Sequence, residues 1–172
     1  ENYLNSRIRE IDAIGEMLRS TGKVTENVSK LVTENNLARK RIEKLQSMLA
    51  AVYMKEMAGR SVMMNGFSFA RGITEADSID FLKLIAGNFR NSDSPFVAVI
   101  GAGIEGKAHL VVMVSDSLVK EGKVSAVDII KTISPAIEGG GGGQPFLASA
   151  GGKNVAGLQK AISLAEEYLR KI

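Results

Sequence analysis

Basic side chains gathered on one predicted helix are the residues best suited to chemistry in this sequence. Arg39, Lys40, Arg41 and Lys44 lie within about one and a half helical turns, and only Glu43 offsets their charge locally. Basic side chains on an exposed helix bind phosphate groups through a salt-sensitive attraction that does not depend on base sequence. The cluster therefore favours RNA or an acidic partner, and an ordinary solvated helix face is the alternative.

The charge of the chain is unevenly distributed. Residues 1–60 carry 11 Lys and Arg against 8 Asp and Glu, whereas residues 61–172 carry 11 of each. Lys30 lies on the same predicted helix as the basic cluster and belongs to this positive part. All of the net positive charge is therefore in the first third of the sequence.

Composition excludes several kinds of catalysis. The sequence has no cysteine and a single histidine, His109, so thiol catalysis, disulfides and a Cys/His zinc site are impossible. We interpret His109, which lies among apolar strand residues without a Ser or Cys partner, as a structural or surface residue. Glu166 and Glu167 fall within the last predicted helix and are interpreted as a solvated face. We therefore predict no catalytic residue and no metal ligand in this chain.

One glycine pattern resembles a nucleotide fingerprint. Gly101, Gly103 and Gly106 have dinucleotide-binding spacing directly after a predicted strand. That fingerprint requires a helix to follow, so that the helix N-terminus faces the pyrophosphate. A strand-like run, AHLVVMV, follows instead. The pattern therefore predicts a glycine-containing hairpin turn between two antiparallel strands.

Two helices are expected to position the basic cluster. Apolar residues recur at helical spacing from Leu4 to Leu18, and a second, heptad-like pattern runs from Val28 to Val52. The second helix should extend to about Met57. We predict that the two form an antiparallel helical hairpin, a coiled-coil arm over residues 1–58.

The two predicted helices differ in length, so the shorter one leaves part of the longer one uncovered. The sequence begins with Glu1 rather than Met, as expected of a piece of a longer protein. The uncovered seam should pack against the following domain, a second copy of the chain, or another part of the parent protein. Its residues are Ile42, Leu45, Leu49 and Val52.

The remainder, residues 59–172, is predicted to be a glycine-rich α/β globular domain. A strand or hairpin is expected over 62–70, a helix beginning with a cap at 74–77, and strands over 94–100 and 108–114. A helix over 125–137, one further strand and a last helix after Asn154 complete the order β-α-β-β-α-β-α. The fold class is therefore α+β: a helical hairpin, then a mixed β-sheet with helices packed on it.

A block of small residues near the end of the chain carries the most specific signal. Five consecutive glycines, 139–143, are followed by Pro145, Ala148, Ala150 and the sequence Gly-Gly-Lys at 151–153. This block resembles the C-terminal end of alanyl-tRNA synthetases, and the helical hairpin resembles the coiled-coil connector of that family. The resemblance covers essentially the whole chain.

The resemblance implies a noncatalytic tRNA-binding and assembly module. In that family the tail binds the outer corner of the L-shaped tRNA(Ala) and links the aminoacylation and editing domains. The implied partners are tRNA, the other synthetase domains and, for a homodimer, a second copy of the chain, in the cytoplasm and away from membranes. No cofactor is expected in this chain, because ATP, magnesium and zinc would bind only in other domains of the parent.

The resemblance also implies which residues contact RNA. Family members often carry Arg or Lys after the glycines, where this chain has Gln144, so one expected charge is missing. The glycines are expected to form an ordered hinge that approaches phosphates or a base pair, with tight backbone packing as the alternative for each. Together with Lys30 and the basic cluster, the predicted RNA-binding residues are Gly141, Gly142, Gly143, Gln144, Lys153 and Asn154.

The sequence also fits two functions other than RNA binding. The uncovered seam favours a dimerisation arm that contacts protein rather than RNA. A phosphodiesterase fragment is the third possibility, because the globular domain resembles one that DHH-type phosphodiesterases share. It is the least favoured, since the Asp-His-His motif is absent from the sequence.

Overall fold

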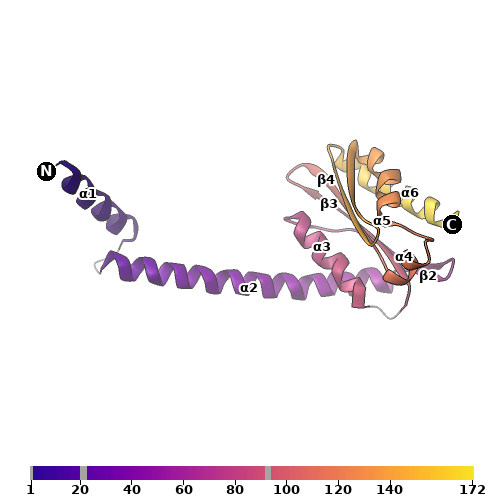
Figure 1. Cartoon of the computed structure of the whole chain (residues 1–172), viewed down its shortest axis with the longest axis horizontal. Coiled ribbons are helices and arrows are strands. Elements are labelled where there is room, and N and C mark those ends of the chain that lie inside the picture. Colours follow the sequence, from indigo (N-terminus) through magenta and orange to yellow (C-terminus); the bar gives the residue numbers. More distant parts are fainter. Residues whose placement is uncertain (1, 20–22, 92–93) are drawn as a thin grey trace. The chain divides into compact units, whose positions relative to one another are not determined.

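A computed structural model describes residues 2–19, 23–91 and 94–172 (Figure 1). The chain divides into two compact units, Glu1–Leu45 and Gln46–Ile172. The division falls within one continuous helix, because α2 (Val24–Gly59) belongs partly to each unit. The predicted domain boundary at residue 58 lies further along α2 and stays a prediction.

The first unit contains α1 (Asn2–Met17) and the first turns of α2. Both predicted N-terminal helices are therefore present. Their apolar residues are nevertheless exposed: Ile8 by 54%, Ile11 by 53% and Leu31 by 48%. The pairing of the two helices as an antiparallel hairpin thus stays a prediction.

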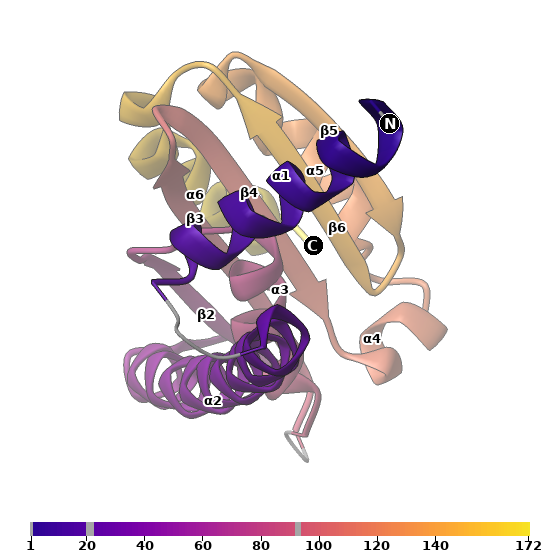
Figure 2. The ribbon, with the colours of Figure 1, turned by 90° about the vertical axis from the view of Figure 1, so that its left-hand side faces the viewer.

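The second unit is built on one six-stranded mixed sheet of strand order β1-β2-β3-β4-β6-β5. β2 and β3 are parallel, and all other neighbours are antiparallel. Figure 2 shows the neighbouring strands β3, β4, β6 and β5 of this sheet. The strands are β1 (Val62–Met64), β2 (Phe67–Ile73), β3 (Phe96–Ile104), β4 (Lys107–Val114), β5 (Gly139–Gln144) and β6 (Leu147–Gly152).

Two tight turns between neighbouring strands have positive φ at both residues. Asn65 and Gly66 connect β1 to β2 with φ values of 48° and 84°, and Glu105 and Gly106 connect β3 to β4 with 49° and 76°. Two-residue hairpin loops with positive φ at both positions match the twist of the strands that they join. The predicted hairpin at Gly106 is therefore confirmed, and no helix follows the glycines there.

Helices cover both faces of the sheet. On one face, the C-terminal part of α2 packs through Ala50 and Met57, and the whole of α3 (Ile79–Asn88) packs through residues such as Ile85. α5 (Ala126–Ile133) and α6 (Leu158–Arg170) pack on the other through residues such as Ile129 and Leu169. The short elements are α4 (Asp116–Lys120), η1 (Phe89–Asn91), η2 (Ser134–Ile137) and η3 (Val155–Gly157). The predicted α+β class is confirmed.

Local details differ from the sequence predictions. The cap expected within 74–77 is wrong, because the hydroxyl of Ser78 accepts the hydrogen bond from the Phe81 amide (3.3 Å) and α3 begins at Ile79. The glycine run forms a strand that was not predicted. Polyglycine carries no side-chain alternation, so its sequence gives no signal of a strand.

Candidate nucleic-acid interface

The five glycines form most of β5, the last strand at one edge of the sheet. Gly139 to Gln144 pair residue by residue with Gly152 to Leu147 of β6. The expected hinge is therefore wrong: this segment is an ordered, hydrogen-bonded strand. Pro145 and Phe146 make the two-residue turn that returns the chain into β6.

Alternate glycines of β5 differ in how closely other atoms approach them. A Cβ on Gly141 would overlap the carbonyl oxygen of Ser149 and lie 2.6 Å from the Cα of Ala150, and Gly139 and Gly143 are similarly close to β6. A Cβ on Gly140 or Gly142 would meet no atom of the described residues within 4 Å, apart from its neighbours in the chain. Three of the glycines thus serve pairing within the sheet, whereas Gly140 and Gly142 leave an open backbone surface.

The register of β6 identifies the face on which this open surface lies. Ala148 and Ala150 are buried in the core that includes α5. Because successive side chains of a strand point to opposite faces, Ser149 and Gly151 point away from that core. Gly142 pairs with Ser149, and Gly140 pairs with Gly151. We call Gly140, Gly142, Ser149 and Gly151 the open glycine face.

His109 borders the open glycine face. It pairs with Gly151 across β4 and β6, and a Cβ on Gly151 would lie 3.8 Å from its Cε1 and Nδ1 atoms. Within the described part of the chain its buried Nδ1 has no hydrogen-bond partner. Sequence reasoning did not include His109 in the site, because only the pairing of β4 with β6 brings it beside the glycines.

The other residues predicted near the glycine run lie at two ends of the β5–β6 hairpin. Gln144 is exposed next to the turn, and Lys153 is exposed just beyond the end of β6. Five residue steps of strand separate these ends, or about 17 Å at 3.3–3.4 Å per residue. They therefore do not form a single loop.

Asn154 has a structural role. Its backbone N–H donates a hydrogen bond to the Ile137 carbonyl (3.0 Å). Its side-chain Oδ1 accepts a hydrogen bond from the backbone N–H of Gly157 (3.2 Å). The predicted cap at Asn154 is present, although it caps η3, which precedes α6. An RNA contact by Asn154 stays a prediction, and its side-chain oxygen is already engaged.

The basic cluster lies on the part of α2 that belongs to the first unit, and its four side chains are exposed. Arg39 donates to the Asn35 side chain (3.0 Å), whereas Lys30 pairs with Glu34 at 3.9 Å. Among the ion pairs of the described residues, none involves Arg39, Lys40, Arg41 or Lys44. The cluster thus presents cations that form no ion pair with a carboxylate of the described residues.

The predicted partner seam is exposed along α2. Ile42 and Leu45 are 55% and 57% exposed, and Leu49 and Val52 are 46% and 58% exposed. Nearby Ala50 is fully buried in the core of the second unit. This core therefore does not cover the seam, and what covers it stays a prediction.

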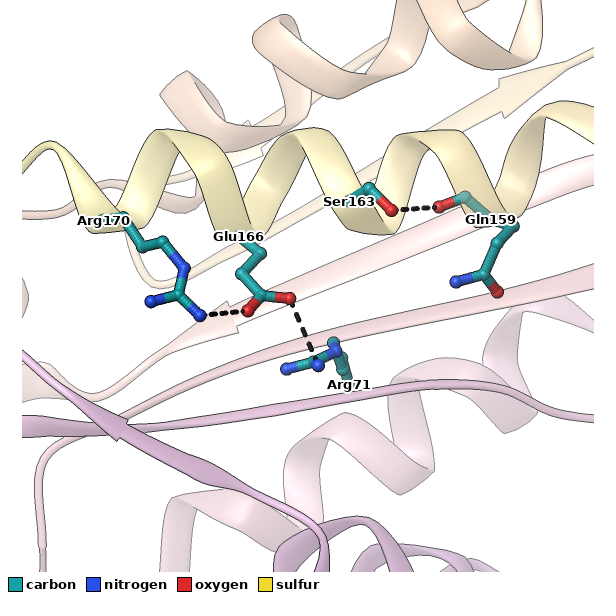
Figure 3. A network of polar contacts seen from close by, with 5 residues as sticks. All are labelled: Arg71, Gln159, Ser163, Glu166 and Arg170. Carbon is teal, nitrogen blue, oxygen red and sulfur yellow. Dashed lines mark hydrogen bonds and ion pairs between the residues drawn. The ribbon is translucent and has the colours of Figure 1, made fainter.

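Carboxylates in the described residues do not assemble a metal site, since no group of three or more His, Asp or Glu side chains could hold an ion there. Glu166 is part of an ion-pair network instead (Figure 3): its carboxylate forms an ion pair with Arg71 of β2 at 3.2 Å and accepts a hydrogen bond from Arg170 at 2.6 Å. The interpretation of Glu166 as a solvated residue is therefore wrong.

In the described segments, no helix has the length and hydrophobicity that spanning a membrane requires.

Comparison with known proteins gives consistent matches. The chain is 30% identical over 163 residues to an alanine–tRNA ligase of Lactobacillus gasseri, which covers 94% of this chain and 18% of that protein. It is 25% identical over 170 residues to the alanine–tRNA ligase of Cytophaga hutchinsonii, covering 99% of this chain and 19% of that protein. The chain thus spans less than a fifth of the length of these relatives.

The fold matches solved structures as well. The crystal structure of the C-Ala domain from Aquifex aeolicus alanyl-tRNA synthetase superposes with a TM-score of 0.58 and 27% identity, covering 64% of this chain and 97% of that one. The DHH domain of a member of the s1p family of ribosomal proteins shares the fold alone, with a TM-score of 0.52 and 16% identity. These matches confirm the predicted resemblance to the C-terminal domain of alanyl-tRNA synthetase. The model of the DHHA1 domain matches residues 78–171, more than half of the sequence, and the chain therefore belongs to the DHHA1 domain family.

Proposed function

We propose that this chain is a noncatalytic tRNA-binding and assembly module of an alanyl-tRNA synthetase. The observation that carries the proposal is similarity along nearly the whole chain to alanine–tRNA ligases, of which it covers only 18–19%. Its structural similarity to a C-Ala domain supports the same role. The aminoacylation and editing sites, with their ATP, magnesium and zinc, then lie elsewhere in a cytoplasmic parent protein.

The module binds the outer corner of tRNA(Ala) and helps both active sites act on one tRNA. Two surfaces suit this role, namely the exposed basic cluster of α2 and the open glycine face. Lysine and arginine supply salt-dependent attraction to phosphates. A strand without side chains lets a phosphate or a base approach the backbone closely. Because the D and T loops of tRNA pack together at its corner, recognition depends on shape more than on base sequence.

The contribution of the basic cluster is tested by tRNA binding at several salt concentrations. Neutralising Arg41 and Lys44 to Gln should weaken binding and flatten the dependence of affinity on salt, by roughly one unit of log–log slope per lost phosphate contact. The matched control neutralises Lys120 and Lys160, two exposed lysines of the second unit. Equal effects of the two double variants would remove the basic cluster from the proposal.

The contribution of the open glycine face is tested with Gly140→Ala and Gly142→Ala together. Both methyl groups enter open space, so the fold should persist while the backbone surface is covered. We expect tRNA affinity to fall about tenfold, or about 1.4 kcal/mol. Gly87→Ala, which also adds a methyl in open space, is the control. Unchanged affinity in the double variant would show that RNA does not contact this face.

Binding at the corner of the tRNA is tested with the RNA itself. A tRNA whose D and T loops are mutated so that they no longer pack should bind more weakly than the intact molecule. A tRNA with a changed anticodon should bind equally well. The reverse pattern would contradict recognition of the corner.

A dimerisation arm remains the second candidate, favoured by the exposed apolar seam of α2. Spacing of three, four and three residues from Ile42 to Val52 is a heptad pattern, which a second helix can cover. Sedimentation of the chain at tens of micromolar tests this function. A dimer that Leu45→Lys dissociates would support it, and a monomer would exclude it.

A further inference from the structure

Asn65 combines a reactive sequence with a defined structural contact. It is the only asparagine of the 172 residues that is followed by glycine. Asn65 and Gly66 form the exposed two-residue turn between β1 and β2, and both have positive φ. Apart from the neighbouring residues in the chain, no atom of the described residues lies within 4 Å of the position that a Cβ would take on Gly66. The described residues therefore leave open space on the glycine side of the Asn65–Gly66 peptide bond.

This arrangement permits a spontaneous reaction that needs only water. The backbone nitrogen of Gly66 attacks the side-chain Cγ of Asn65, a new C–N bond forms, and the side-chain nitrogen leaves as ammonia. Water then opens the resulting five-membered succinimide. Opening gives either aspartate or isoaspartate, the latter with the backbone running through the former side chain. Carbon, nitrogen and oxygen balance without an oxidant or a reductant.

The side-chain amide of Asn65 has a function that the reaction would remove. Its Nδ2 donates a hydrogen bond to the backbone carbonyl of Leu169 at 3.0 Å, joining residues 104 positions apart. Leu169 is fully buried in the core and lies in the last turn of α6, where carbonyl groups lack partners within the helix. The amide therefore connects the β1–β2 hairpin to the end of α6.

A carboxylate at residue 65 cannot replace this contact. An ionised carboxylate only accepts hydrogen bonds, so it would face the Leu169 carbonyl without a donor. It would also place negative charge at the negative end of the helix dipole of α6. Both effects disfavour the docking of α6 against the hairpin.

We propose that Asn65 is a site of spontaneous deamidation, and that its conversion releases the contact between the β1–β2 hairpin and α6. The proposal does not depend on RNA binding.

The site is tested by incubating the folded chain at mildly alkaline pH and following its tryptic peptides by mass spectrometry. Cleavage after Arg60 and Arg71 isolates residues 61–71, and cleavage after Lys30 and Arg39 isolates the peptide that contains Asn36. Digestion in heavy-oxygen water distinguishes conversion in the folded chain from conversion during digestion. We expect residue 65 to convert well before Asn36, which is exposed on α2 but followed by leucine. If Asn65 is converted no faster than Asn36, the assignment of Asn65 as the site of deamidation is overturned.

The consequence is tested with Asn65→Asp, which reproduces one product directly. We expect the unfolding midpoint to fall by several degrees and the amides of the last turns of α6 to exchange faster with deuterium. Asn36→Asp adds the same charge at an exposed position of α2. It should change neither the unfolding midpoint nor the deuterium exchange of the last turns of α6. An Asn65→Asp chain with an unchanged midpoint and unchanged exchange would overturn the structural consequence.

Discussion

At the scale of single residues, the ion pair between Arg71 and Glu166 joins two distant parts of the chain. Arg71 is on β2 and Glu166 is on α6, and their side chains are 33% and 21% exposed. The Arg71 guanidinium also lies over the ring of Phe69, at 5.4 Å from its centre. Its Nη1 atom is buried and has no hydrogen-bond partner among the described residues. Removing Glu166 would therefore leave a partly buried cation without its carboxylate.

Substitution of Glu166 by alanine should destabilise the chain by about 1–2 kcal/mol. This lies between the small effect of a surface pair and the 3–5 kcal/mol of a fully buried one, because both side chains are partly exposed. Urea unfolding of the variant measures the change. Glu167→Ala removes the exposed neighbouring carboxylate and should cost much less. Equal losses from the two substitutions would contradict a specific role for Glu166.

At the scale of elements, the glycine strand is defined by its partner strand. Glycine disfavours strands intrinsically, so the pairing of β5 with β6 must supply what its own residues do not. The alternation within β5 divides the strand into glycines that the pairing requires and glycines that it leaves open. The same strand can then contribute both to the fold and to a binding surface.

Gly141→Ala should destabilise the second unit by roughly 1–3 kcal/mol, the usual cost of forcing extra atoms into a packed site. Its methyl group would overlap the Ser149 carbonyl oxygen, so the edge of the sheet must shift. Amide hydrogen exchange along β5 and β6, together with the unfolding midpoint, measures this. Gly140→Ala adds the same methyl one residue away in open space and should leave both nearly unchanged. A larger effect at Gly140 than at Gly141 would show that the alternation is wrong.

At the scale of the whole molecule, the two hydrophobic cores found among the described residues both lie in the second unit. Their buried residues run from Ala50 to Leu169, so the last turns of α2 are part of the globular fold. Met57 packs directly against Gly72 of β2, where a Cβ would lie 2.8 Å from its terminal methyl carbon. A globular domain cut at residue 59 would lose these contacts.

Two truncated chains test where the folding unit begins. Residues 46–172 should unfold cooperatively with nearly the midpoint of the full chain. Residues 59–172 lack Ala50 and Met57 and should be less stable by about 2–5 kcal/mol, the range for losing a large buried side chain. Thermal unfolding followed by circular dichroism compares them. Equal stability of the two would instead favour the boundary predicted from the sequence.

Some properties of this chain follow from local sequence alone. Helical spacing of apolar residues predicted α1 and α2, and β-branched runs predicted β3 and β4, because each pattern reflects the geometry of one element. Gly106, next to a strand-like run, predicted a hairpin rather than a nucleotide loop. The glycine-to-lysine block at 139–153 indicated the family, because it combines several small residues in one fixed order.

Other properties depended on tertiary structure. Pairing with β6 made a strand of five glycines, and pairing with β4 brought His109 beside Gly151. Packing of α6 on β2 gave Glu166 an arginine partner from 95 positions earlier in the chain. Each of these contacts joins two segments, and the local sequence of neither segment indicates which other segment it contacts. Local sequence determined which elements form, and only long-range packing decided which residues share a surface.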